Sequence, residues 1–352
     1  MGLGAAARLA RWLGPWADQV DHPPVSREEV LGASGLRARV YRPVARAARG
    51  SLLLVPGLHP EGPGDPRLDR FAAVLAGAGM VVYAPFMRDF MALRLKARLL
   101  DDARGALDGL LALPDRPAGR PGVFSVSFGS LPALSLAAER GAELGGVVTF
   151  GGYADWRRAL AFCLTGAPGV PHDPLNRPVV YLNLLPWLPG APRDTASLVS
   201  AWMRFVEATW GRVEMKAPGA SGPVARELAV SVQEDARGLF LEGCGAGEAG
   251  LTPAVRAALA AAGDRSWLDP RPLLARAGCR VTVVHGADDD VIPHTEADAL
   301  YAALRPDRRA GHYVTGLYGH TGASGGRGPV ALAREFVDMM GIVRAIARVA
   351  GA

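Results

Sequence analysis

The chain has 352 residues, of which 49% are hydrophobic and 21% are charged, a composition typical of a folded globular protein with a substantial core. Its formal net charge is +5, but its 39 basic residues are scattered among 34 acidic ones. Because a surface that binds nucleic acid needs basic side chains concentrated on one face, the sequence argues against a nucleic-acid partner.

The N-terminal segment, residues 1–27, is predicted to be helical. Its apolar side chains recur at roughly helical spacing, at Leu3, Leu9, Leu13, Trp16 and Val20. Arg8 and Arg11 interrupt the apolar run that a signal peptide requires, and no stretch of the chain reaches the roughly 18 apolar residues of a membrane span. We expect the helix to pack on its own domain, with weak contact to a membrane surface as the alternative, and we expect a cytoplasmic protein.

Short apolar runs alternate with helical patterns over residues 28–153. Strands are expected as two edge strands within 29–40, separated by a turn at Ser34-Gly35, and at Ser51–Val55, Met80–Tyr83, Val123–Val126 and Gly146–Phe150. Helices are expected at Asp65–Ala78, Leu99–Leu113 and Phe128–Arg140. Continuous apolar runs suit strands buried on both faces, and the alternation of strands with helices predicts an α/β fold with a mostly parallel sheet.

The pattern changes over residues 154–267. This segment has no strand alternation, contains several breaks rich in Pro and Gly, and includes helical stretches such as Thr195–Thr209 and Pro253–Ala262. Five of the seven tryptophans lie in it or beside it. We predict a helical cap inserted after the strand at 146–150, with tryptophans that either line an apolar pocket or fill the core of the cap itself.

The alternation of strands and helices resumes after residue 267. Strands are expected at Arg280–Val284 and near Tyr313–Leu317, and helices at Pro272–Ala277, Thr295–Leu304 and Val330–Val349. Residues 28–153 and 268–352 are therefore expected to form one core, which the segment 154–267 interrupts.

The sequence Ser125-Val126-Ser127-Phe128-Gly129 lies between a predicted buried strand and a predicted helix. A nucleophile elbow needs a sharp turn at such a place, with small residues two before and two after the nucleophile so that neighbouring backbones can approach. Gly129 meets this need, whereas Ser125 occupies a position where glycine is usual. Taken alone, the motif is equally compatible with an ordinary serine-rich loop.

Two further polar segments follow predicted strands. The segment His285–Pro293 contains the consecutive aspartates Asp288, Asp289 and Asp290, and the segment Leu317–Gly322 contains His320. The candidates thus occur in the chain order Ser, Asp, His, each at the carboxyl end of a strand, where the sites of open parallel sheets assemble. An imidazole titrates near neutrality and can deprotonate a serine hydroxyl, and a buried carboxylate can hold that imidazole in the required tautomer.

At these positions the chain resembles the α/β-hydrolase superfamily, in particular capped bacterial hydrolases without assigned substrates. The similarity spans residues 28–153 and 268–350. The resemblance implies a serine hydrolase with Ser127 as the nucleophile and His320 as the base. In the family pattern the acid of the triad lies four residues before a proline, which selects Asp289.

Some of these roles have alternatives within the sequence. Asp288 is the main rival of Asp289 as the acid, and Asp155 is a lesser one because some family members place the acid after the preceding strand. His312 is the alternative base.

The resemblance also implies an oxyanion hole. Its donors would be the backbone N–H of Phe128, next to the nucleophile, and that of Leu58, in the loop after the strand that ends at Val55. His59 in the same loop is a candidate contact for the substrate, with an ordinary surface histidine as the alternative reading.

Lysine and cysteine are sparse in this chain. Lys96 and Lys216 are the only lysines, which together with abundant Ala, Gly and Pro indicates GC-rich coding of a bacterial kind. The three cysteines, Cys163, Cys244 and Cys279, are far apart. They form neither a disulfide framework nor a metal-binding motif and fit a reducing cytosol.

We therefore expect an enzyme that hydrolyses a carboxylic ester or thioester of a small molecule through an acyl-serine intermediate, with a hydrophobic acyl or alcohol group. No metal or organic cofactor is expected. An acyltransferase that uses the same triad and a catalytically inactive binding protein are the alternatives. The sequence leaves the identity of the substrate and the oligomeric state open.

Overall fold

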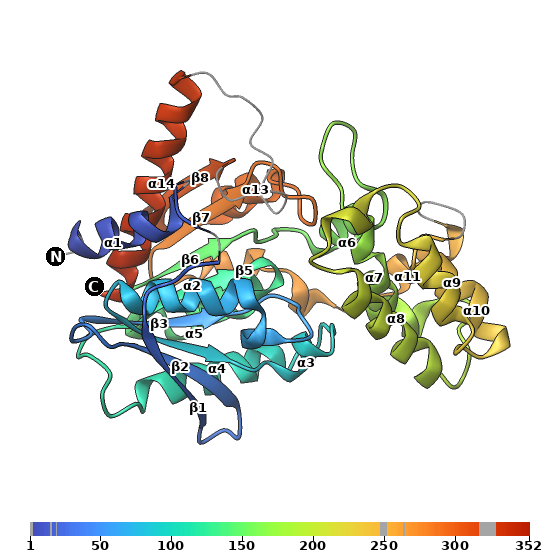
Figure 1. Cartoon of the computed structure of the whole chain (residues 1–352), viewed down its shortest axis with the longest axis horizontal. Coiled ribbons are helices and arrows are strands. Elements are labelled where there is room, and N and C mark those ends of the chain that lie inside the picture. Colours follow the sequence, from blue (N-terminus) through green and yellow to red (C-terminus); the bar gives the residue numbers. More distant parts are fainter. Residues whose placement is uncertain (1–2, 15, 19, 247–251, 263–264, 317–328) are drawn as a thin grey trace.

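The structure is a computed structural model that describes the chain except residues 1–2, 15, 19, 247–251, 263–264 and 317–328. Within the described residues, eight strands form one sheet in the order β1-β2-β4-β3-β5-β6-β7-β8. The strands are β1 (Val25–Leu31), β2 (Arg37–Pro43), β3 (Gly50–Val55), β4 (Met80–Pro85), β5 (Gly122–Val126), β6 (Gly146–Phe150), β7 (Val281–Gly286) and β8 (Arg309–Thr315). Figure 1 shows helices on both faces of this sheet.

The sheet is mostly parallel, as predicted. β2 pairs antiparallel with β1 and with β4, whereas every other neighbouring pair from β4 to β8 is parallel. β3, β4 and β7 are buried along their whole length, which is why continuous apolar runs in the sequence marked their positions.

Alternate residues of each strand pack against different helical layers. Leu52 and Leu54 of β3 face one layer, and Leu53 and Val55 face the other. The first layer consists of α1 (Leu3–Leu13), α2 (Pro66–Gly77) and α14 (Pro329–Ala350). The second consists of α3 (Arg88–Met91), α4 (Leu99–Leu111), α5 (Ser130–Arg140), α12 (Arg271–Ala275) and α13 (Thr295–Ala303).

Helix α1 packs on its own domain. Ala5, Ala6 and Leu9 are buried in the layer that contains α2 and α14, as the helical spacing of the N-terminal segment predicted. Among the described residues, no helix combines the length and the apolar character needed to cross a bilayer.

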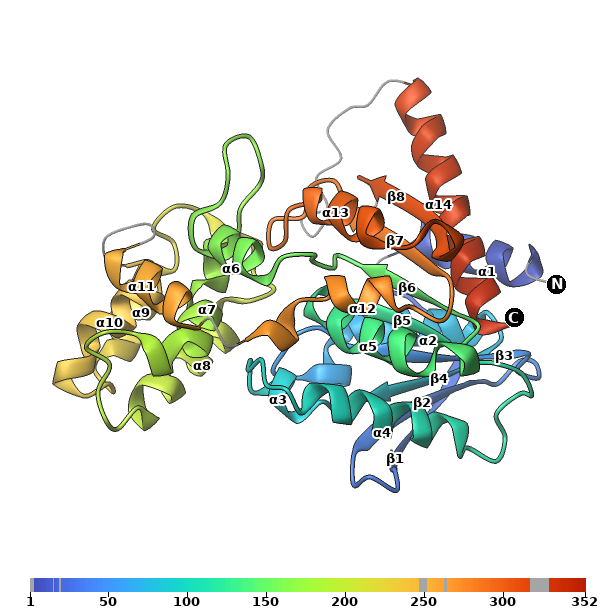
Figure 2. The same cartoon turned by 180° about the vertical axis from the view of Figure 1, so that it is seen from behind.

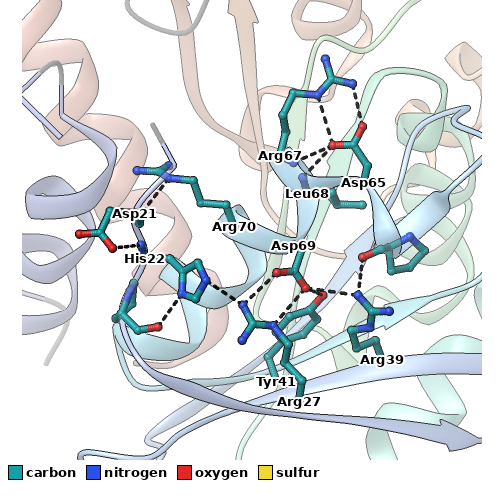
Figure 3. A network of polar contacts seen from close by, with 12 residues as sticks. Asp21, His22, Arg27, Arg39, Tyr41, Asp65, Arg67, Leu68, Asp69 and Arg70 are labelled. Carbon is teal, nitrogen blue, oxygen red and sulfur yellow. Dashed lines mark hydrogen bonds and ion pairs between the residues drawn. The ribbon is translucent and has the colours of Figure 1, made fainter. Parts of the chain in front are cut away.

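Polar contacts fasten α2 to the antiparallel hairpin β1–β2, as Figure 3 shows. At the N-terminus of α2, the side chain of Asp65 accepts hydrogen bonds from two backbone N–H groups of the first turn. One turn later, Asp69 accepts hydrogen bonds from three side chains of the hairpin, those of Arg27, Arg39 and Tyr41. The hairpin and the helix are therefore held together beside β4, the strand that separates the hairpin from β3.

Two edge strands differ from the expected positions. β1 begins at Val25, inside the segment 1–27 that was expected to be helical, and β8 spans Arg309–Thr315 rather than residues near 313–317. Both strands are partly exposed along most of their length, and β1 carries charged residues at consecutive positions. Neither strand therefore has the continuous or alternating apolar pattern that marks a buried one.

The chain between β6 and β7 is helical. It contains α6 (Trp156–Thr165), α7 (Arg177–Leu184), α8 (Ala196–Thr209), α9 (Gly222–Ala229), α10 (Arg237–Gly243) and α11 (Pro253–Ala261). Figures 1 and 2 show these helices grouped on one side of the sheet, apart from the helices that flank it. Trp202 is fully buried, and its indole N–H donates to the carbonyl of Phe240, so this tryptophan serves the core of the helical segment.

Candidate active site

Ser127 occupies the turn between β5 and α5. β5 ends at Val126, and residues Ser127–Gly129 form a short 3-10 helix, η2, that leads into α5. The backbone of Ser127 has a φ of +53°, a left-handed conformation that costs a non-glycine residue of order 1–3 kcal/mol and persists only where the surrounding structure enforces it. The side chain is half-buried. The strained strand-to-helix turn of a nucleophile elbow is therefore present.

Close backbone packing explains the glycine at the end of the motif. A Cβ atom on Gly129 would lie 2.3 Å from the carbonyl oxygen of Pro56, so a side chain has no room between the elbow and the loop after β3. A Cβ atom on Gly57 would lie 3.2 Å from Cβ of Ser127, because the same loop passes directly by this serine. Ser125 is fully buried within the sheet, where its small side chain replaces the usual glycine.

Two backbone donors lie beside Ser127. The N–H of Phe128 directly follows Ser127, and the N–H of Leu58 belongs to the residue after Gly57, which contacts the elbow. Among the described residues, no hydrogen bond uses either of these N–H groups. Unused, preorganised donors next to a nucleophile are what an oxyanion hole requires.

Asp289 lies in the loop after β7, next to the elbow. A Cβ atom on Gly151, the residue after β6, would lie 3.2 Å from Oδ2 of Asp289 and 3.9 Å from the backbone nitrogen of Ser127. Oδ1 accepts hydrogen bonds from the N–H groups of Val291 and Ile292, both at 2.9 Å, and the residue is 4% exposed. A buried carboxylate in a fixed orientation near Ser127 meets the needs of a triad acid.

The other acidic candidates have different surroundings. Asp155 caps α6 by accepting hydrogen bonds from the N–H groups of Arg157 and Arg158, and Asp290 forms an ion pair with Lys216. Both side chains are thus engaged in structural contacts. Asp288 is half-buried in the turn just before Asp289.

The expected base, His320, belongs to residues 317–328 and lies outside the described residues. The preceding strand, β8, pairs parallel with β7, so its carboxyl end lies at the same edge of the sheet as the Asp289 loop. His312, the alternative base, lies within β8. Its ring stacks on that of Tyr301 with 5.0 Å between centroids, and its Nε2 lies 3.3 Å from Asp298. These contacts hold the ring of His312 against α13. They give no support to His312 as the base for Ser127.

His59, in the loop after β3, lies beside Trp210 of the helical segment. Its Nε2 lies 3.0 Å from Oδ2 of Asp65, and its Nδ1 accepts a hydrogen bond from the N–H of Glu61. Its ring centroid lies 5.9 Å from that of Trp210, at the end of α8. Burial opposes ionisation of Asp65, but hydrogen bonds from His59 and Arg67 outweigh it and hold the pKa of that carboxyl well below its usual range.

The cysteines and His285 have structural surroundings. All three cysteines are buried and free, and burial raises the pKa of Cys163 to about 12 and that of Cys279 to about 11, so these thiols are protonated at neutral pH and are poor nucleophiles. The Nε2 of His285 donates a hydrogen bond to the carbonyl of Ile292 at 2.9 Å and lies 3.3 Å from Oδ2 of Asp289. Within the described ranges, no cluster of His, Cys, Asp and Glu could hold a metal ion.

Lys216 was not predicted from the sequence to be a site residue. Its ammonium lies between Asp173 and Asp290, which are distant from it in the chain. The one indication in the sequence was that lysine is rare in this chain, since Lys216 is one of two lysines among 39 basic residues.

Comparisons with known proteins give structural similarity alone. No family model and no curated protein matches the chain. The acylaminoacyl peptidase of Pyrococcus horikoshii is 12% identical, with a TM-score of 0.44 over 84% of this chain and 37% of that one. The dipeptidyl peptidase 4 of Porphyromonas gingivalis is 14% identical, with a TM-score of 0.48 over 91% and 35%. The esterase domain of a Rhodothermus marinus protein is 15% identical, with a TM-score of 0.47 over 94% and 100%. The chain spans little more than a third of the length of the first two proteins.

The topology of the sheet identifies the fold. The strand order, the antiparallel placement of β2 and the helices on both faces are those of the α/β-hydrolase fold. A serine in a left-handed turn directly after β5 is the position that this fold gives to its nucleophile. The chain therefore has the α/β-hydrolase fold.

Proposed function

We propose that the chain is a serine hydrolase that cleaves a carboxylic ester or thioester through an acyl-serine intermediate. The observation that carries the proposal is the left-handed backbone of Ser127 at the carboxyl end of β5, because strain of this kind gathers at active sites. The buried carboxylate of Asp289 beside the elbow and the unused N–H groups of Leu58 and Phe128 support the same function.

In the proposed reaction, His320 takes the proton of the Ser127 hydroxyl while the oxygen attacks the carbonyl carbon. The N–H groups of Leu58 and Phe128 stabilise the negative charge that develops on the carbonyl oxygen. The alcohol or thiol leaves with the proton from His320, and the acyl group stays on Ser127. A water molecule that His320 deprotonates then releases the carboxylic acid and restores the serine. Asp289 fixes the tautomer of the imidazole and stabilises its charged form.

The proposal includes residues 154–267 as a cap over the carboxyl edge of the sheet. Two contacts between the helical segment and that edge support it, those of Trp210 with His59 and of Lys216 with Asp290. An apolar cap near the elbow would suit a small substrate with a hydrophobic acyl or alcohol group, and His59 is then a candidate contact for it. Free, buried cysteines fit a reducing compartment, and we place the protein in the cytoplasm.

A panel of p-nitrophenyl esters and matching thioesters of graded acyl length tests this function. We expect hydrolysis of at least one member, at a rate that falls by about 10³-fold or more in Ser127→Ala. Ser200→Ala, at an exposed position of α8, serves as the matched control and should retain the wild-type rate. Hydrolysis that survives Ser127→Ala unchanged would contradict the assignment of the nucleophile.

The same panel separates the proposed function from its alternatives when an alcohol or amine is added as a competing acceptor. A hydrolase releases mainly the free acid, whereas an acyltransferase forms mainly the new ester or amide. A protein that turns over no substrate and whose Ser127 does not react with a fluorophosphonate would instead be a binding protein.

A further inference from the structure

An ion cluster joins the helical segment to the loop that carries Asp289. The Nζ atom of Lys216, at the end of η6 (Val213–Lys216), lies 2.9 Å from Oδ2 of Asp173 and 2.5 Å from Oδ2 of Asp290. Asp173 directly precedes η4 (Pro174–Asn176) in the helical segment, whereas Asp290 directly follows Asp289. The cluster therefore bridges two parts of the fold at the residue next to the proposed acid.

Two further hydrogen bonds reinforce this connection. The backbone N–H of Asp173 donates to the carbonyl of Asp290 at 2.8 Å, and the thiol of Cys163 in α6 donates to the carbonyl of Val291 at 3.2 Å. Both residues that follow Asp289 are thus bound to the helical segment. Because the N–H of Val291 is one of the two donors to the Asp289 carboxylate, the orientation of that carboxylate depends on the same connection.

Burial makes the loss of one partner costly. The side chain of Asp290 is 3% exposed, that of Asp173 is 9% exposed and that of Lys216 is 23% exposed. Burial lowers the pKa of Lys216, but its hydrogen bonds to Asp290 and Asp173 outweigh this effect and raise it, so the ammonium is charged at neutral pH. Without the cation, two buried carboxylates would repel each other directly beside Asp289.

We propose that Lys216 is a positioning residue for the catalytic acid. By pairing with Asp290, it holds the Asp289 loop in the orientation that supports His320 and so makes catalysis depend on the docked position of the helical segment. This role rests on the proposed hydrolase function, and Lys216 acts through Asp290 without touching the reacting atoms. A lysine suits the position because its compact ammonium can lie between two carboxylates.

Steady-state kinetics on an ester that the wild type hydrolyses test the proposal. Lys216→Met is expected to lower kcat about tenfold and to change KM by less than about threefold, because an orienting carboxylate acts mainly in the transition state. Lys96→Met provides the matched control at the other lysine, whose side chain is 60% exposed, and should keep both constants. All rates are measured below the melting temperature of each variant, determined by circular dichroism, so that unfolded protein does not contribute.

Three more variants separate positioning from general structural support. Lys216→Arg keeps the positive charge and is expected to recover most of the kcat that Lys216→Met loses. Asp290→Asn should lower kcat, and the double variant Lys216→Met/Asp290→Asn should lose no more than the more severe single variant, because both substitutions cut the same link. Wild-type kcat in folded Lys216→Met, or losses that multiply in the double variant, would overturn the positioning role.

A failure of the proposed function has a different signature. If Ser127→Ala kept wild-type turnover, both the hydrolase mechanism and the role of Lys216 in it would be overturned. If turnover depended on Ser127 but not on Lys216, the positioning role alone would be overturned.

Discussion

At the scale of single residues, Gly129 shows how tightly the elbow is packed against the loop after β3. A Cβ atom there would meet the carbonyl oxygen of Pro56 at 2.3 Å, and a main-chain carbonyl cannot rotate out of the way. We expect Gly129→Ala to lower the free energy of unfolding by about 1–3 kcal/mol, as overpacked substitutions do, and to displace Ser127 enough to abolish hydrolysis. Chemical denaturation followed by circular dichroism measures the first effect.

Gly238 in α10 supplies the control for this substitution. A Cβ atom at Gly238 meets nothing within 4 Å, and alanine is favoured over glycine in a helix. Gly238→Ala should therefore leave the stability unchanged or raise it slightly. If Gly129→Ala likewise left the stability unchanged, the result would contradict the close packing of Gly129 against the backbone of Pro56.

The choice between Asp289 and Asp288 can be tested by substitutions that keep their shape. Asparagine cannot stabilise a charged imidazole and favours the wrong tautomer, so we expect Asp289→Asn to lower kcat by about 10⁴-fold. Asp288→Asn should change kcat by less than about threefold, since the proposed mechanism gives its carboxylate no part in the reaction. The reverse ranking, measured by steady-state kinetics on the same ester, would assign the acid to Asp288.

Residue roles differed in how visible they were in the sequence. Ser127 and Gly129 lie in one short motif, and the resemblance to the hydrolase family, with an acid four residues before a proline, predicted Asp289 among three aspartates. The link through Lys216 could not be predicted, because its partners lie far away in the chain. An ion pair between distant segments produces no regular spacing in the local sequence.

At the scale of elements, Asp69 fastens α2 to the β1–β2 hairpin (Figure 3). Burial would raise the pKa of Asp69, but hydrogen bonds from Arg27 and Tyr41 outweigh it and lower that pKa. Asp69→Asn should therefore reduce the free energy of unfolding at pH 7 by about 1–3 kcal/mol, the range for hydrogen bonds to charged groups. Urea denaturation of both proteins gives the difference.

The pH dependence of that difference follows from the direction of the pKa shift. A carboxyl group whose pKa is lower in the folded protein stabilises the fold above its unfolded pKa of about 3.9, and the stabilisation disappears as the pH falls through the folded value. The difference in the free energy of unfolding between wild type and Asp69→Asn should thus be largest at pH 7 and decrease below about pH 4. Asp101→Asn, at a carboxyl that is 74% exposed, should show a gap below about 1 kcal/mol. A gap for Asp69 that does not depend on pH would contradict the charged network.

Elements were predictable where burial leaves a clear pattern. The inner strands β3 to β7 have apolar runs that the packing of helices on both faces requires. The outer strands β1 and β8 are partly exposed, so their positions depend on pairing with a neighbour, which periodicity alone does not reveal.

At the scale of the whole molecule, the order of strands and helices brings separate segments to one edge of the sheet. The elbow after β5, Gly151 after β6 and Asp289 after β7 lie side by side there. The alternation of strands and helices predicted this edge, because parallel strands end together. The contacts of Trp210 and Lys216 with that edge could not be predicted, since no local pattern in the sequence of the helical segment reveals where it docks.

His320 is proposed to activate the hydroxyl of Ser127, and the site and rate of labelling by a fluorophosphonate provide the sharpest test of this role. Peptide mass spectrometry of the wild type should find one label, on the peptide that contains Ser127, and Ser127→Ala should carry none. Labelling should slow by about 10³-fold or more in His320→Ala and proceed at the wild-type rate in His312→Ala. A label on another residue would contradict Ser127 as the nucleophile. A wild-type rate of labelling in His320→Ala would contradict His320 as its base.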